Sequence, residues 1–160
     1  MWSSDITYIK TASGTVYLET IIDWYSKAVL SWNISNTMDS GLVMRVLDDA
    51  VDRFGTPEIF NTDQGSQYTS YVHTQRFKDH RVIISMDGKG RATDNICIER
   101  FWRSAKCERI YLNEYNGLLD LRLDMADYID FYNNRRFHES ISYKKPMTFY
   151  WKNLDRKKVA

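Results

Sequence analysis

The stretch that decides the fold is residues 5–34, which read DITYIKTASGTVYLETIIDWYSKAVLSWNI. Three of its segments, 5–9, 16–24 and 28–34, are rich in β-branched and aromatic residues, a composition typical of β-strands. The connections are short, and Ser13-Gly14 between the first two segments is a turn signal. Consecutive strands with short connections pair antiparallel, so the sequence predicts a three-stranded meander.

After the meander the hydrophobic residues change to helical spacing. From Leu42 to Phe54 they recur every three or four residues, with Asp39 or Ser40 as the cap. Further strands are expected at 59–63 and 81–86 and further helices at 72–80, from about 93, and from Leu118 to Tyr132. Alternating strands and helices after a meander predict an α/β fold with a mixed five-stranded sheet and helices on both faces. We expect residues 1–134 to form the core and 135–160 a basic, aromatic C-terminal tail of the same domain, in which Pro146 interrupts any helix.

Length and composition exclude several classes of protein. The 160 residues suffice for one domain, and 43% hydrophobic content is typical of a folded protein. No apolar run approaches the roughly 20 residues of a membrane span. Met1 leads directly into a strand-like segment, which indicates a cytoplasmic protein without a secretory leader. Cys97 and Cys107 lie ten residues apart and match no metal-ligand spacing, so we expect reduced thiols.

The charge is distributed unevenly along the chain. Residues 1–99 hold 9 Lys and Arg against 13 Asp and Glu, whereas residues 100–160 hold 13 against 8. The first part therefore carries excess acid that could bind cations, and the second carries excess base that could bind a polyanion. An accidental imbalance is the alternative on these numbers alone.

Three carboxylates are candidates for a shared site. Asp5 lies on the first strand, Asp63 at the end of the fourth, and Glu99 in the first turns of a later helix. If the fourth strand pairs beside the first, Asp5 and Asp63 become neighbours, and the helix can bring Glu99 to them. Clustered carboxylates repel unless a cation neutralises them, which favours Mg²⁺ or Mn²⁺. Taken singly, each acid also fits a structural role, such as an Asx turn for Asp63 or an ion pair with Arg103 for Glu99.

The segments around these acids resemble the catalytic core of bacterial insertion-sequence transposases of the retroviral-integrase (DDE, orfB-type) family. The resemblance rests on Trp2–Ile9, Asp63–Tyr68 and Asp94-Asn95-x-x-x-Glu99, and on the thirty-five residues between the second and third acids. A basic residue seven positions after the Glu, here Lys106, is a further family feature. Tyr132–His138 resembles the family's C-terminal Tyr-Asn-x-x-Arg-x-His signature, with Phe137 where Pro is common.

The resemblance implies an RNase H-like fold and an enzyme that transfers DNA strands with two Mg²⁺ or Mn²⁺ ions. Asp5, Asp63 and Glu99 would be the catalytic metal ligands, and water or a DNA 3′-OH would attack a phosphodiester in line. The implied partners are transposon ends, target DNA and a second copy of the chain, in the bacterial cytoplasm at the nucleoid. The residues expected to support the site or contact DNA are Lys89, Arg91, Asn95, Arg103, Lys106, Arg136 and His138.

The beginning of the sequence departs from the family pattern. Members usually carry DNA-end-recognition helices before the first acid, whereas Asp5 lies four residues after the start. We therefore expect this region to be absent, so that the chain is either a truncated reading frame or a piece that needs a separately encoded recognition subunit. Two other functions fit the same residues: an RNase H-like nuclease that only hydrolyses DNA, and a non-catalytic DNA-binding or assembly remnant of a mobile element.

Overall fold

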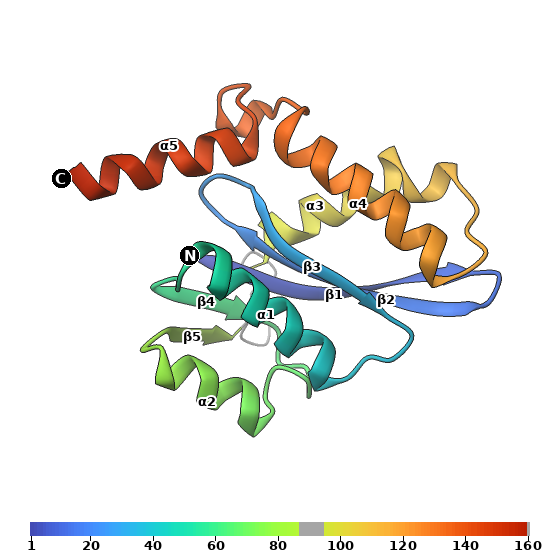
Figure 1. Ribbon diagram of the computed structural model, residues 1–160, viewed down its shortest axis with the longest axis horizontal. Coiled ribbons are helices and arrows are strands. Elements are labelled where there is room, and N and C mark those ends of the chain that lie inside the picture. The colour runs from blue at the N-terminus through green and yellow to red at the C-terminus, as the bar shows by residue number, and fades with distance from the viewer. Residues whose placement is uncertain (87–94, 160) are drawn as a thin grey trace.

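A five-stranded mixed sheet forms the centre of the protein in the computed structural model, which describes the backbone of residues 1–86 and 95–159 (Figure 1). The strands are β1 (Trp2–Thr11), β2 (Gly14–Asp23), β3 (Val29–Ser35), β4 (Ile59–Thr62) and β5 (Ile83–Met86), in the order β3-β2-β1-β4-β5. The first three form the predicted antiparallel meander, while β4 pairs parallel with β1 and β5 pairs parallel with β4. The predicted α/β class and strand arrangement are confirmed.

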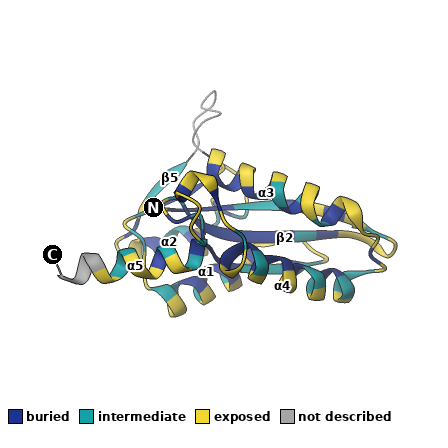
Figure 2. Ribbon diagram, turned by 90° about the horizontal axis from the view of Figure 1, so that it is seen from above, coloured by how far each residue is buried: buried dark blue, intermediate teal, exposed yellow. Residues whose placement is uncertain are grey.

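Helices cover both faces of the sheet, and α3 lies on the side opposite α1 and α2 (Figure 2). The helices are α1 (Ser40–Phe54), α2 (Tyr71–Asp79), α3 (Ile96–Glu108), α4 (Leu118–Asn134) and α5 (Pro146–Val159), with short 3₁₀ turns at η1 (Ile110–Leu112) and η2 (Glu139–Ile141). Asp39 caps α1 as predicted, since its side chain accepts from the Leu42 amide. Within the described residues, no helix is long and apolar enough to cross a membrane.

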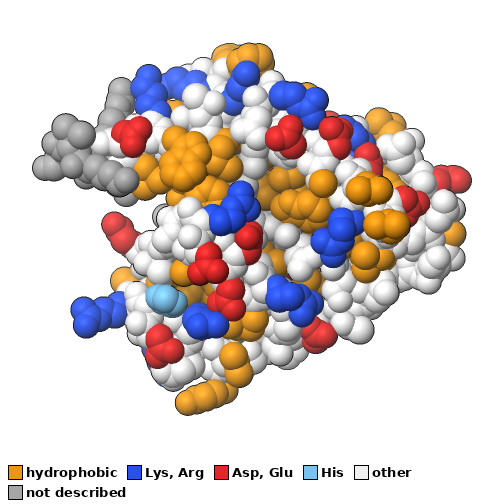
Figure 3. Space-filling model, in the orientation of Figure 1, with side chains coloured by type: hydrophobic (Ala, Val, Ile, Leu, Met, Phe, Trp, Pro, Cys, Tyr) orange, Lys and Arg blue, Asp and Glu red, His pale blue; other side chains and the backbone are white. Residues whose placement is uncertain are grey.

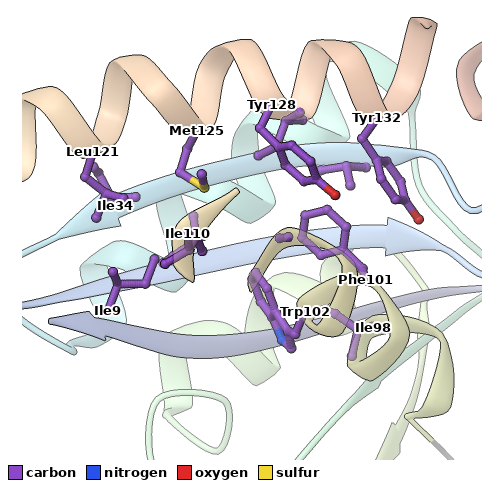
Figure 4. Packing of buried hydrophobic residues seen from close by; sticks show 14 of the residues in the cluster. Ile9, Ile34, Ile98, Phe101, Trp102, Ile110, Leu121, Met125, Tyr128 and Tyr132 are labelled. Atoms are coloured by element: carbon purple, nitrogen blue, oxygen red, sulfur yellow. The ribbon is translucent and has the colours of Figure 1, made fainter. Parts of the chain in front are cut away.

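Two hydrophobic clusters, one on each face, hold the layers together. On one face α3 and α4 pack on β1–β3, and Tyr128 and Tyr132 of α4 point toward Phe101 of α3 (Figure 4). On the other face α1 and α2 cover β4 and the near ends of β1–β3 through residues such as Leu47. This double cover explains why β2 is buried along almost its whole length.

The C-terminal tail contains a helix that the sequence did not predict, α5. The prediction that Pro146 interrupts a helix is wrong, because Pro146 is the first residue of α5. At that position the missing N–H has no helical partner to lose and the fixed φ suits the helix. Tyr150 is buried against the face that α1 covers, so at least the first half of α5 belongs to the core.

Asn133 connects the end of α4 to the sheet. Its side chain is buried, and its amide accepts from the Val29 N–H at 2.9 Å and donates to the Val29 carbonyl at 2.8 Å. The side chain thus replaces a neighbouring strand at the start of edge strand β3. Asn133 therefore helps fix α4 to the sheet.

The Asn133→Ala variant should lower the free energy of unfolding by about 2 kcal/mol, because both backbone groups of Val29 lose their partner in a buried place. Urea denaturation measures this. Asn134→Ala is the matched control, since Asn134 is exposed and its amide donates to Asp130 on the same helix. Equal stability of the two variants would contradict the role assigned to Asn133.

Candidate active site

Asp5 and Asp63 come from adjacent parallel strands. Trp2 lies opposite Phe60 and Ser3 opposite Asn61, so the same register continued by two residues brings Asp5 level with Asp63. Asp63 directly follows β4, at the end of the strand where the chain turns into a loop. Carboxyl ends of parallel strands are the usual place for ligands in such sheets. The pairing of the first and fourth strands, which was the condition for predicting this neighbourhood from the sequence, is present in the structure.

Trp102 connects α3 to Asp5. Its indole Nε1 donates to Asp5 Oδ2 at 3.0 Å, so α3 crosses β1 at the level of the first acid. Glu99 lies three residues before Trp102, almost one helical turn away. Both Asp63 and Glu99 are exposed, while Asp5 is half-buried beneath them.

The three acids interact electrostatically. The pKa of Asp5 is raised to about 6, first because burial disfavours its charge and further because the carboxylates of Asp63 and Glu99 lie near it. The bonds from Trp102 and from the Ile6 backbone oppose this rise without cancelling it. Asp5 therefore occupies a place where an added positive charge would be strongly favoured.

Asp63 is held by the loop that follows it. Its Oδ1 accepts from the Gly65 N–H at 2.8 Å, which is the Asx turn that the sequence also allowed. A Cβ on residue 65 would lie 2.9 Å from that same oxygen, so a side chain there would displace the Asp63 carboxylate from its present position. The Asx turn and a ligand role are compatible, because the carboxylate retains its second oxygen.

A fourth carboxylate, Glu19, lies fully buried next to these acids. The Tyr68 hydroxyl donates to its Oε2 at 2.8 Å, and the Ser4 hydroxyl donates to its Oε1. Burial raises the pKa of Glu19 well above its usual value, the two hydroxyls oppose that rise, and Asp5 and Asp63 add to it. Sequence reasoning did not find Glu19, and the available signal was an acid in the middle of a segment rich in Val, Ile, Leu and Tyr.

Carboxylate oxygens are the ligands that hard divalent cations prefer, and the mutual repulsion at Asp5 is the kind that such a cation relieves. Among residues 1–86 and 95–159, however, no three Asp, Glu, His or Cys side chains already stand in a metal-binding arrangement. Within the same ranges, the buried Oδ1 of Asn95, at the start of α3, has no hydrogen-bond partner. The donor chemistry of the site thus fits Mg²⁺ or Mn²⁺, provided that Glu99 and Asp63 move toward Asp5.

The predicted DNA contacts fall into separate groups. Lys89 and Arg91 lie outside the described residues. Arg103, Arg136 and His138 come together at a pocket of about 500 Å³ that Lys27 and Arg100 also line. Lys106 instead lies in a second pocket further along α3.

Arg136 and His138 also have partners within the protein. The Arg136 guanidinium forms an ion pair with Glu108 at 2.6 Å and contacts His138 Nδ1 at 3.1 Å. The buried His138 ring contacts the Tyr132 carbonyl through Nε2 at 3.2 Å. These contacts hold the end of α4 against α3, and a direct DNA contact by either residue stays a prediction.

The chain belongs to the family of integrase core domains, since one model with that description matches residues 1–92 and a second matches residues 80–146. Within this class, the chain is similar in sequence to transposases of bacterial insertion sequences. It is 36% identical over 156 residues to the transposase InsF for insertion sequence IS3A of Escherichia coli (strain K12), covering 96% of this chain and 54% of that protein. It is 30% identical over 147 residues to the transposase for insertion sequence element IS629 of Shigella sonnei, covering 91% and 50%. The chain thus spans about half the length of the curated relatives it matches.

Solved structures show the same fold. The catalytic core domain of BIV integrase superposes with a TM-score of 0.77 at 14% identity, covering 98% of this chain and 96% of that one. The HTLV-2 integrase catalytic core domain, solved in complex with magnesium in a dimeric form, gives a TM-score of 0.64 at 19% identity, covering 91% and 92%. The fold is therefore RNase H-like, as the family resemblance implied.

Proposed function

We propose that this chain is the catalytic core of an enzyme that cleaves DNA and joins a 3′ end to a target strand during transposition. The observation that carries the proposal is the convergence of β1, the end of β4 and α3, which places Asp63 and Glu99 near enough to raise the pKa of Asp5. Family membership supports the reaction class, because its members include transposases.

Asp5, Asp63 and Glu99 would hold two divalent ions, Mg²⁺ or Mn²⁺. Such a pair, when bound, supplies activation of the attacking oxygen and stabilisation of the leaving oxygen in phosphoryl transfer. The HTLV-2 integrase core, solved with magnesium, supports this choice of cofactor. The protein's own part is orientation: Trp102 fixes one oxygen of Asp5, and the Gly65 amide fixes one oxygen of Asp63.

DNA would lie over α3, where the cations gather. Lys27, Arg100 and Arg103 line the pocket there, and among its described lining residues Glu139 is the one acid, so the pocket favours phosphates as ligands. Lys106 is seven residues beyond Glu99, about 10 Å along the same side of the helix, within reach of the same strand. Lys89, Arg91 and Asn95, nearest Glu99 in the chain, complete the proposed contacts. A separately encoded recognition subunit stays a proposal.

The proposed working form is a homodimer in the bacterial cytoplasm, at the nucleoid. Hydrophobic side chains gather between α1, α4 and α5 (Figure 3), where Trp32, Phe54, Met147 and Trp151 line a groove of about 320 Å³. Trp151 is 47% exposed there, which favours burial against a second copy. Sedimentation equilibrium tests this, and a monomer at high protein concentration would contradict it.

The function is tested by supplying duplexes with randomised ends and free 3′-OH groups together with a plasmid target. We expect joined products with Mg²⁺ or Mn²⁺ and none with EDTA. Plasmid nicks without joined products would instead identify the hydrolytic nuclease. DNA binding in low salt with neither product, and with no binding of Mn²⁺, would identify the non-catalytic remnant.

A further inference from the structure

The edge of β1 beyond the acids is open. Strand β4 pairs with β1 only at Trp2 and Ser3, and within the described residues no other strand pairs with that edge. The edge runs from Asp5 to Thr11, so it begins at the candidate active site. An extended ligand that runs from the acids along this edge would therefore meet no β-strand among the described residues.

A pocket of about 430 Å³ wraps around the far part of this edge. Tyr8 and Lys10 line it from the strand, while Lys106 and Tyr111 line it from α3 and η1. Buried Ile9 and Ile110 form its apolar floor. By the usual strand rise, Lys10 lies about 17 Å from Asp5 along β1.

The pocket combines free cations with exposed rings. Tyr8 and Tyr111 are 62% and 71% exposed. In the described part of the chain, neither Lys10 nor Lys106 forms an ion pair. Of the nearby acids, Asp124 is already bound by Arg109 at 2.7 Å and by the Tyr115 hydroxyl at 2.5 Å, so it does not neutralise the lysines.

We propose that this pocket binds an unpaired segment of a DNA strand whose reacting phosphate lies at the acids. Lysines beside exposed aromatic rings match single-stranded nucleic acid, in which the phosphates pair with cations and the bases stack on rings. In a duplex the bases are already stacked on one another, so the rings of Tyr8 and Tyr111 would have no free base face to contact. This inference rests on the proposed function and adds the strand's path beyond the reaction.

The test is the affinity of the full chain for a fluorescent single-stranded 20-mer and for the matching blunt duplex, by anisotropy without divalent ions. Tyr111→Ala should weaken binding of the single strand about tenfold, by loss of a stacked base. Lys10→Gln should weaken it and reduce the slope of log K against log salt by about 0.7. Two substitutions away from the pocket are the matched controls. Tyr25→Ala, at the opposite end of the sheet, and Lys78→Gln, on α2, should leave both the affinity for the single strand and the salt slope unchanged.

Three results would overturn the proposal: no binding of the single strand by the unmodified chain, unchanged affinity in both pocket variants, or an equal loss for the duplex. Circular dichroism verifies that the variants are folded, and Tyr8→Phe, which keeps the ring, should bind normally. The result of this binding test does not depend on whether the chain joins DNA. A chain that joins DNA while its pocket variants bind normally refutes only the pocket, and one that binds through the pocket but never joins DNA refutes only the proposed function.

Discussion

Replacement of Asp5 by asparagine is expected to abolish DNA joining and at the same time to make the metal-free protein harder to unfold. The loss of joining should be at least about 1000-fold, because an amide cannot supply the negative charge that the divalent ions require. The fold should remain, since the asparagine oxygen can still accept the bond from Trp102. Initial rates of joining with Mn²⁺ measure the first effect.

The gain in stability follows from the pKa of Asp5. Its value of about 6 in the folded protein exceeds the ordinary 3.8, so the folded state binds the proton more tightly than the unfolded state. The stabilisation from that proton is complete below pH 4 and is lost as the pH rises through 6. At pH 7 the ionised acid costs up to about 3 kcal/mol, and we expect asparagine to recover about 1–2 kcal/mol of it.

Thermal unfolding between pH 4 and 8 checks this sign. The variant should unfold at a higher temperature than the unmodified chain at pH 7, and the difference should shrink toward pH 4. Mn²⁺ should raise the unfolding temperature of the unmodified chain only, and less below pH 6, where protons compete for Asp5. Asp52→Asn, at an exposed position on α1, is the control and should change neither property. An Asp5→Asn protein that still joins DNA would refute the proposed site.

The sequence was sufficient to predict the elements that local patterns determine. The meander follows from β-branched runs with short turns, and α1 from helical spacing with Asp39 as its cap. The pairing of Asp5 with Asp63 needed one further assumption, that β4 lies beside β1. Pro146 was misjudged because its effect depends on where the helix begins, and a proline at the first position costs no hydrogen bond.

The rest of the site depends on contacts between segments far apart in the sequence. The helical spacing of apolar residues predicted that Trp102 is a core residue, and Trp102 is buried. Its hydrogen bond to Asp5, however, exists because α3 crosses β1 at the level of Asp5, which no local pattern indicates. Glu19 was missed for a similar reason. In an isolated strand a lone acid indicates a solvent-facing position, whereas β2 is central and covered on both faces.

Glu19 is expected to be the most sensitive position outside the three acids. It pairs with Ile6 across the strands, so its side chain lies on the face opposite that of Asp5. There it accepts hydroxyl bonds from Ser4, the neighbour of Asp5, and from Tyr68, in the loop after Asp63. One buried group thus connects the two chain segments that present the first two acids.

Glu19→Leu should lower the free energy of unfolding by about 2–4 kcal/mol, because it leaves two buried hydroxyls without their acceptor. Where that variant is still folded, joining should fall about 10- to 100-fold, as is usual when groups that orient metal ligands are lost. Glu19→Gln keeps the size and the acceptor oxygen and should retain activity within a few-fold. Comparison of the two variants therefore distinguishes the contribution of the hydrogen bonds of Glu19 from the contribution of its side-chain volume.

The pH dependence gives a second, independent check. Because burial raises the pKa of Glu19 in the folded state, the folded protein binds this proton more tightly than the unfolded chain does, and the stability that this gives is lost as the pH rises through the raised pKa. The glutamine variant has no such proton to lose, so its stability relative to the unmodified chain should increase in alkaline solution. Urea denaturation from pH 6 to 10 measures the difference. A Glu19→Leu protein as stable and as active as the unmodified chain would show that the two segments hold their acids without this connection.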